Sequence, residues 1–314
     1  MLNRRHIRIK VMQTLYAFNG TESDDLKRDE KFLLQSLESM YDLYLITLSL
    51  LIEVQKKAED HLAKTQKKFL ATQEEKNPNY KFINNKVLAL IKDDNTLKNE
   101  LENRKLDYWY LDFEYVDIIF KAILESSIYK DYMKTKTSDF NEDKTFLIDV
   151  FSEIVAPNEK LYDYFEDKKL TWIDDLPIVN TSILKLLKKV KPNVSQSYFT
   201  PKLYKDLEDR DFAIELFKKT ILNRSKFSEE IAKKTTNWDS DRIANLDAVL
   251  LQMALCEFQK FPSIPVKVTI NEYLEIAKEY STPKSSIFIN GILDKIIKEY
   301  SQQGKYPKMG RGLL

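Results

Sequence analysis

Glycine and proline are so scarce in this chain that they largely decide its fold class. The 314 residues include only 5 glycines and 9 prolines. Sheet-rich folds need many tight turns, and glycine is the usual residue where the backbone must adopt a positive φ. We therefore expect an all-α fold of long helices with short connections. A chain of this length can bury a sizeable core without disulfides.

The cysteine content indicates the compartment of this protein, whereas its net charge does not indicate a partner. Lys and Arg number 50 and Asp and Glu 49, so the net charge of +1 does not indicate nucleic acid, and only local clusters can. The single cysteine, Cys256, lies in the apolar run 249–256. We expect a buried, unreactive thiol with a raised pKa, in a reducing compartment.

The N-terminus and the apolar runs do not indicate export or a membrane. The first eight residues carry charges but are not followed by the apolar core of a signal peptide. The most apolar stretch, 43–52, is flanked by Asp42 and Glu53 and is far shorter than the roughly 20 residues of a membrane span. We expect a soluble, cytoplasmic protein.

Most signatures of catalysis are missing from the sequence. The only histidines are His6 and His61, and neither has a second ligand one helical turn away. Neither a glycine-rich phosphate loop nor a Gly-x-Ser-x-Gly motif occurs. Paired carboxylates such as Asp93-Asp94 are expected to cap helices or face solvent. We predict no enzyme activity, no cofactor and no metal.

The first segment, 3–18, is predicted to be an amphipathic helix that ends before Gly20. It contains no acidic residue, and four cations crowd its first half. Cations at a helix N-terminus interact unfavourably with the helix macrodipole. A departure of this kind from the usual charge preference often marks a functional site. The candidate contacts on this helix are Arg4, Arg5, Arg8 and Lys10.

The remaining chain divides into predicted helical regions. A very long helix, or two, is expected over 26–71, one helix over about 84–101, and one over about 107–133. The inner face of the last is expected to hold Trp109, Phe113, Val116, Ile119, Phe120 and Ile123. The expected domains are a basic N-terminal helix (1–20), a long-helix insertion region (21–136), a first helical repeat (137–192), a C-terminal helical domain (193–303) and a basic, disordered tail (304–314).

Two segments resemble each other. Placing 143–187 on 209–253 needs no gaps and aligns two Trp-x-x-Asp motifs, Trp172 to Asp175 and Trp238 to Asp241. This pattern predicts an internal duplication of a helix, a linker and a second, Trp-capped apolar helix.

The last quarter is predicted to form three helices. The run 246–258 is apolar nearly all round and should be buried. Thr269 and Glu272 have the spacing of a capping box for the next helix. The last helix should begin at 284–286, with Phe288, Ile292 and Ile296 on one stripe. Gly291 inside it costs about 1 kcal/mol against alanine, which close packing or a ligand contact would explain.

Motifs at both ends of the chain resemble the NusB family. The motifs are Arg4-Arg5-x-x-Arg8, Gln13-Thr14-Leu15-Tyr16, Pro265-Val266-Lys267-Val268-x-Ile270-Asn271-Glu272, Ala277-Lys278 and Phe288-Ile289-Asn290-Gly291-Ile292-Leu293-Asp294-Lys295. The resemblance covers about 3–18 and 209–300. Family members are generally near half this length, so the chain looks like an enlarged form.

The resemblance implies a function and a site. NusB-like proteins are all-helical and non-catalytic, and they bind the boxA element of nascent ribosomal RNA with the small-subunit ribosomal protein that acts as NusE. The pair joins an antitermination complex on RNA polymerase. Besides the cations of the first helix, the implied RNA contacts are Lys267, Lys284, Ser285 and Phe288, with Phe288 as the stacking platform. The implied contact with the protein partner is Asp247.

Two other hypotheses about the function remain open. A helical protein–protein scaffold could keep the NusB core without reading RNA, with the long insert carrying its own partner. Separately, Ile287 stands where many family members have a polar or basic residue, which implies RNA binding that is weaker or differently placed. An RNA-modifying enzyme with a NusB-like domain would need an attached α/β cofactor domain, for which the glycines are too few. The structural alternatives are capping roles for Asn271 and Glu272, plain surface positions for Lys267 and Lys284, and a core position for Phe288.

Overall fold

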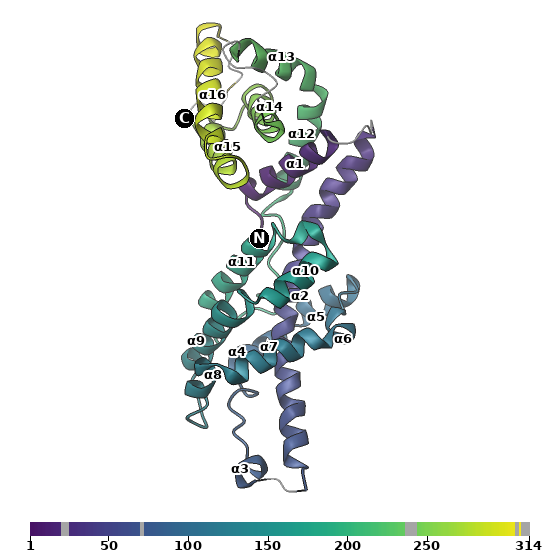
Figure 1. Ribbon diagram of the computed structural model, residues 1–314, viewed down its shortest axis with the longest axis vertical. Helices are drawn as coiled ribbons and strands as arrows, with labels where there is room; N and C mark the ends of the chain where they lie inside the picture. Colours follow the sequence, from purple (N-terminus) through teal and green to yellow (C-terminus); the bar gives the residue numbers. More distant parts are fainter. Residues whose placement is uncertain (20–24, 70–71, 236–243, 305–307, 309–314) are drawn as a thin grey trace. The chain divides into compact units, whose positions relative to one another are not determined.

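The computed structural model describes residues 1–19, 25–69, 72–235, 244–304 and 308. Regular secondary structure in these residues is helical throughout, without a strand, which confirms the all-α prediction (Figure 1). The chain forms two compact units, one of residues 1–37 and 203–314 and one of residues 38–202. Among the described residues, no helix combines the length and apolarity that a bilayer crossing requires.

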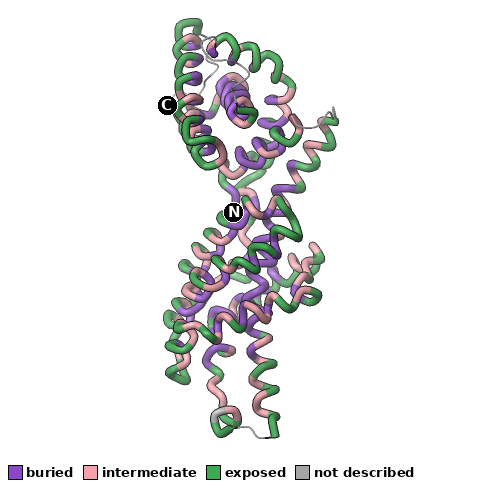
Figure 2. The backbone as a smooth tube through the Cα atoms, in the orientation of Figure 1, coloured by how far each residue is buried: buried purple, intermediate pink, exposed green. Residues whose placement is uncertain are grey.

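The first unit is built around one buried helix. Its helices are α1 (Arg4–Asn19), the start of α2 (Leu26–Gln66), α12 (Leu207–Leu222), α13 (Arg224–Lys234), α14 (Asn245–Lys260), α15 (Val266–Tyr280) and α16 (Ser285–Gln302). The central helix α14 packs against α1, α12, α13, α15 and α16. Its residues 249–258 are all buried (Figure 2), as the all-round apolar pattern predicts.

The second unit is assembled on the long helix α2, whose 41 residues confirm the predicted long helix. The other helices of this unit are α3 (Gln73–Lys76), α4 (Lys86–Lys92), α5 (Asn95–Asn103), α6 (Tyr108–Leu111), α7 (Phe113–Glu125), α8 (Ser127–Tyr132), α9 (Phe140–Val150), the π-helical turn η1 (Phe151–Val155), α10 (Glu159–Lys168), the 3-10 turn η2 (Leu170–Trp172) and α11 (Leu176–Lys189).

Two predicted helices of this unit are in fact divided. The single helix expected over 84–101 is two, because the Asp94 carboxylate accepts from the backbone N–H of Leu97 and caps α5. The helix expected over 107–133 breaks before Phe113 and again at Ser126, whose hydroxyl caps α8. Phe113 is consequently 62% exposed instead of lying on the inner face. At Asp94 and Ser126 a short polar side chain accepts a backbone N–H of the following helix and so favours a new helix start over continuation. At the break before Phe113, the Asp112 side chain makes no such capping hydrogen bond.

The helix bounds follow the alignment that suggested a duplication. Helix α9 with η1 corresponds to α12, α10 to α13, and α11 to α14. Asp143 and Asp209, aligned in the sequence, both lie buried in the first turn of their helices. Trp238 and Asp241 lie outside the described residues. The correspondence agrees with the duplication, which stays a prediction.

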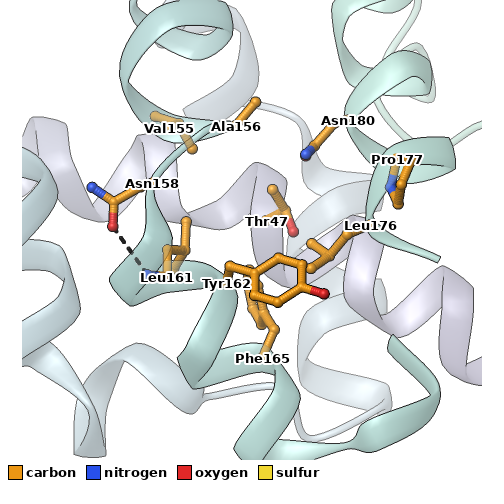
Figure 3. Close-up of a pocket in the computed structure, with 10 residues that line it drawn as sticks. All are labelled: Thr47, Val155, Ala156, Asn158, Leu161, Tyr162, Phe165, Leu176, Pro177 and Asn180. Atoms are coloured by element: carbon orange, nitrogen blue, oxygen red, sulfur yellow. Dashed lines mark hydrogen bonds between the residues drawn. The ribbon is translucent and has the colours of Figure 1, made fainter. Parts of the chain in front are cut away.

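A small cleft opens in the second unit (Figure 3). It encloses about 150 Å³ between α2, η1, α10 and α11, and its lining includes Thr47, Leu161, Phe165, Leu176 and Asn180. It contains none of the residues predicted to bind RNA. The lining has neither a carboxylate nor a cationic side chain, so it offers no acid–base pair for catalysis.

Candidate nucleic-acid interface

A buried ion pair joins the first helix to the centre of the first unit. Arg8 donates from Nε to Glu257 Oε1 at 2.6 Å and from Nη2 to Oε2 at 2.9 Å. The same carboxylate accepts from Thr269 Oγ1 at 3.0 Å and from the Tyr273 hydroxyl at 2.8 Å. All four residues are buried. The Glu257 carboxylate thus fixes α1, α14 and α15 to one another with charge-assisted hydrogen bonds.

This geometry corrects two of the sequence-derived contacts. Arg8 is 2% exposed and Lys10 is 3% exposed, so neither can reach a phosphate while the unit is folded. Burial alone would lower the pKa of Arg8, but the facing Glu257 raises it above its usual range. Arg8 therefore stabilises the core instead of contacting RNA. The three arginines of α1 are paired with carboxylates of later helices, which the sequence did not reveal.

The two leading arginines lie closer to solvent. Arg4 donates from Nε to Asp209 Oδ1 at 3.0 Å, and Arg5 forms a two-pronged pair with Glu272, with both distances 2.9 Å. Both arginine side chains are 40% exposed. The hydrogen bonds that Arg5 donates to Glu272 raise the pKa of Arg5, with smaller contributions from Glu275 and Glu279. These arginines keep an accessible surface, but acidic side chains offset their charge.

Asp247 and Ser285 belong to an internal hydrogen-bond cluster. Ser281 donates its hydroxyl to Asp247 Oδ1 at 2.6 Å and lies 3.0 Å from Ser285 Oγ, which is 2.8 Å from Thr282 Oγ1. Asp247 is 5% exposed and Ser285 is 2% exposed. The expected roles of Asp247 as a partner contact and of Ser285 as an RNA contact are therefore wrong for the folded unit. Both residues fix the connection between α15 and α16.

That connection presents the remaining predicted contacts. Lys267 in the first turn of α15 and Lys284 just before α16 are exposed, and Phe288 in the first turn of α16 is part-exposed. The neighbouring Ile287 is 75% exposed. Helix α15, which carries Lys267, packs against α1, which carries the N-terminal arginines, and against α16, which Lys284 precedes.

The helix α15 does not begin as predicted. Its N-cap is Pro265, and Thr269 is fully buried against Glu257 instead of capping the helix. Glu272 pairs with Arg5 instead of completing a capping box. The predicted stripe on α16 holds for Ile292 and Ile296, which are buried.

Gly291 provides a first testable prediction. A Cβ placed there would meet nothing within 4 Å, so close packing does not explain this glycine. Replacing Gly291 by alanine should raise the free energy of unfolding by about 0.5–1 kcal/mol, because alanine loses less backbone entropy in a helix. Urea unfolding followed by circular dichroism measures the change. A destabilised Gly291→Ala variant would contradict the open surroundings, and a stabilised variant that binds RNA less well would indicate a ligand contact.

The described part of the C-terminal tail also departs from expectation. Lys308 is buried, and its ammonium donates to the carbonyl oxygens of Glu257 and Phe261 at 3.0 and 2.9 Å, at the end of α14. Burial lowers the pKa of Lys308 to about 8. Its ammonium caps a helix C-terminus and is not available to phosphates. The other tail cations, Lys305 and Arg311, lie outside the described residues.

Sequence reasoning missed the acceptors of the first unit, above all Glu257. An acidic residue within an otherwise apolar, buried helix was the available signal, because such a charge needs a partner. The Cys256 prediction is confirmed: the residue is buried, and burial raises its thiol pKa to about 12. The described residues contain no cluster of side chains suited to hold a metal ion.

Comparison with known proteins identifies the family. The family model described as the NusB family matches residues 181–298. Three similar proteins are all named Transcription antitermination protein NusB. The protein of Salinibacter ruber is 45% identical over 112 residues, which are 36% of this chain and 70% of that protein. That of Chloroherpeton thalassium is 41% identical over 109 residues (35% and 52%), and that of Koribacter versatilis 41% over 103 residues (32% and 70%).

No solved structure matches the chain. The matched residues cover α12 to α15 and most of both α11 and α16. On the strength of these matches and of the helical unit that they cover, this chain belongs to the NusB family, as an enlarged member.

Proposed function

We propose that this protein is a cytoplasmic, non-catalytic transcription antitermination factor that binds boxA-like single-stranded RNA. It would act with a small-subunit ribosomal protein serving as NusE, within an antitermination complex on RNA polymerase. The observation that supports this most is the 45% identity to a protein named for antitermination, over 70% of that protein. The aligned family region includes the exposed Lys267 and Lys284.

The proposed RNA contacts are those that remain accessible in the folded unit. Single-stranded RNA is held by cations on phosphates and by planar groups stacked on bases. Lys267 and Lys284 supply exposed cations, and the part-exposed Phe288 supplies a ring. Arg5 uses two of its five N–H donors on Glu272 and exposes 40% of its side chain, which suits stacking and additional phosphate contacts. Arg4 would contribute similarly.

A second candidate function is a helical scaffold that binds proteins but reads no RNA. One specific observation favours it. The arginines expected to hold phosphates are already paired, Arg8 with Glu257, Arg5 with Glu272 and Arg4 with Asp209. An anion would have to compete with these carboxylates. RNA titration separates the two functions.

Charge neutralisation tests the lysines. The Lys267→Gln/Lys284→Gln variant should flatten the slope of log K against log salt by about 1.4 for boxA-like RNA, because each single-stranded phosphate contact contributes roughly 0.7. Labelled RNA would be titrated by fluorescence anisotropy at several salt concentrations, with and without the ribosomal partner. Lys295→Gln/Lys298→Gln, which removes two exposed lysines of α16, is the matched control and should leave the slope unchanged. Absence of binding by the unaltered protein at low salt, even with the partner, would favour the scaffold.

The ring of Phe288 is tested separately. Phe288→Ala should weaken RNA binding by about 1–3 kcal/mol if the ring stacks on a base. A part-exposed ring should cost less on truncation than the roughly 3–5 kcal/mol of a buried phenylalanine. A variant with a markedly lowered melting temperature and unchanged RNA affinity would assign Phe288 to the core.

A further inference from the structure

The second unit carries a lysine-rich surface that the proposed function does not use. The stretch 176–205, whose last three residues belong to the first unit, contains six lysines and no aspartate or glutamate, although the whole chain has a net charge of only +1. Four of these lysines lie at the end of α11 or just after it: Lys185, Lys188, Lys189 and Lys191. A local excess of this size in a nearly neutral protein indicates an anionic partner.

The fold gathers these lysines on one exposed face. Residues three and four apart are neighbours on a helix surface, so Lys185, Lys188 and Lys189 point the same way. The opposite face of α11 buries Ile183 and Leu187 in the core of the unit. All four lysines, including Lys191 beyond the end of the helix, are exposed.

None of these four lysines has a carboxylate within 4.0 Å among the residues that the structure describes. Other lysines of the same unit do, as in the pairs Lys56–Glu53, Lys57–Asp117, Lys121–Glu125 and Lys134–Asp131. Among the described residues, no carboxylate therefore pairs with the lysine charges at the end of α11. This distinguishes these lysines from the arginines of α1.

The helix dipole accounts for only part of this pattern. Cations in the last turn of a helix are favoured, which covers Lys188 and Lys189. The effect falls off within one turn, so it does not explain Lys185 one turn earlier. It also does not explain the absence of acidic residues from the thirty positions around them.

An aromatic ring lies beside the lysines. The hydroxyl of Tyr198 donates to the carbonyl oxygen of Leu186 at 2.8 Å, which ties the tyrosine to the last turns of α11. Tyr198 is part-exposed, and its ring packs nearly perpendicular to the buried Phe199 ring, with centroids 5.1 Å apart. The ring is thus supported from the core and held next to the cations.

We infer that the end of α11, with Lys185, Lys188, Lys189, Lys191 and Tyr198, is a second binding surface for single-stranded RNA. The lysines would contact successive phosphates, and the tyrosine ring would stack on an unpaired base. Contacts of this kind are tolerant of sequence, so the surface would hold RNA next to a boxA-like element without reading it. The inference rests on the proposed function in that both assign RNA to this chain, but it involves other residues in another unit.

The test compares two RNAs on the full chain. One is a boxA-like single strand and the other is oligouridylate of equal length, each titrated by fluorescence anisotropy over a range of salt concentrations. For the variant Lys185→Gln/Lys188→Gln/Lys189→Gln/Lys191→Gln we expect the salt slope for oligouridylate to flatten by about 2–3, since each contact contributes roughly 0.7. The control removes four paired lysines: Lys56→Gln/Lys57→Gln/Lys121→Gln/Lys134→Gln. It makes the same change in net charge and should leave the slope unchanged.

Tyr198 is tested by two substitutions that separate its ring from its hydroxyl. Tyr198→Leu should bind oligouridylate roughly 5-fold to 100-fold more weakly, because it loses the stacking ring. Tyr198→Phe keeps the ring and should stay within a few-fold of the unaltered protein. Equal losses of RNA affinity in both variants would mean that only the hydrogen bond from the Tyr198 hydroxyl to Leu186 matters. This result would overturn the stacking role.

The outcomes distinguish this inference from the proposed function. The four-lysine variant could bind both RNAs with an unchanged salt slope while the preference for boxA persists. This result would overturn the second surface alone. Lysine-dependent binding of both RNAs without any boxA preference would support the second surface and contradict the proposed function. Failure of the unaltered protein to bind either RNA at low salt would overturn both.

Discussion

Replacing Glu257 by glutamine should lower the free energy of unfolding by about 3–5 kcal/mol, because the buried Arg8 guanidinium loses its hydrogen-bonded counter-charge. The Glu272 carboxylate, 3.8 Å from Arg8 Nη1 and already paired with Arg5, compensates the loss only in part. Arg8 is 2% exposed and Glu257 is fully buried, so water cannot take over the lost interaction. The carboxylate also accepts from Thr269 and Tyr273, and an amide oxygen replaces these hydrogen bonds only in part. Urea unfolding monitored by circular dichroism measures the loss.

A second substitution shows whether the two charges act as a pair. The double variant Arg8→Met/Glu257→Gln removes both charges and should be more stable than Glu257→Gln alone, since no uncompensated charge stays buried. Strictly additive losses would contradict the coupling. Glu215→Gln, which breaks the exposed pair with Lys219, is the control and should cause no measurable change.

The same variants also test whether Arg8 belongs to the proposed RNA-binding site. Because Arg8 lies inside the unit, a folded Arg8→Met protein at low temperature should bind RNA like the unaltered protein. A loss of RNA affinity without a loss of stability would return Arg8 to the interface.

Truncation of Trp172 to alanine should cost about 3–5 kcal/mol in the second unit. Its indole is 1% exposed, and it lies against Phe165 with ring centroids 5.9 Å apart. The indole N–H also donates to Ser39, to the carbonyl oxygen at 2.9 Å and the hydroxyl at 2.7 Å. The alanine variant loses the buried ring, leaves a cavity and removes the donor for these oxygens.

Trp172→Phe separates packing from hydrogen bonding. It keeps a ring of reduced size and should cost less than the alanine variant, with about 1 kcal/mol from the lost hydrogen bond and the rest from the smaller volume. Native-state hydrogen exchange, read from the amides of α10 and α11, measures the effect in this unit. Tyr110→Ala, at a side chain that is 83% exposed, is the control and should leave exchange unchanged. A Trp172→Ala variant with unaltered exchange would contradict the packing role.

The sequence alone determined the features that depend on local pattern. Scarce glycine and proline, together with helical periodicity, predicted the helical class, the long helix α2 and the buried helix α14. Motif spacing at both ends predicted the family, because spacing along a chain does not depend on its folded shape. Helix ends were less well predicted, since one side chain such as Asp94 can outweigh the propensity of a whole segment.

Whether each charged residue is paired, buried or exposed depends on the tertiary structure. The carboxylates that compensate Arg4, Arg5 and Arg8 lie 205, 267 and 249 positions away in the chain, beyond the reach of any local rule. The sequence showed four cations crowded on a helix, and a basic helix of this kind suits either a polyanion or a set of internal carboxylates. Only packing against α12, α14 and α15 determines which charges are neutralised, because the strength of an ion pair depends on distance and burial in three dimensions.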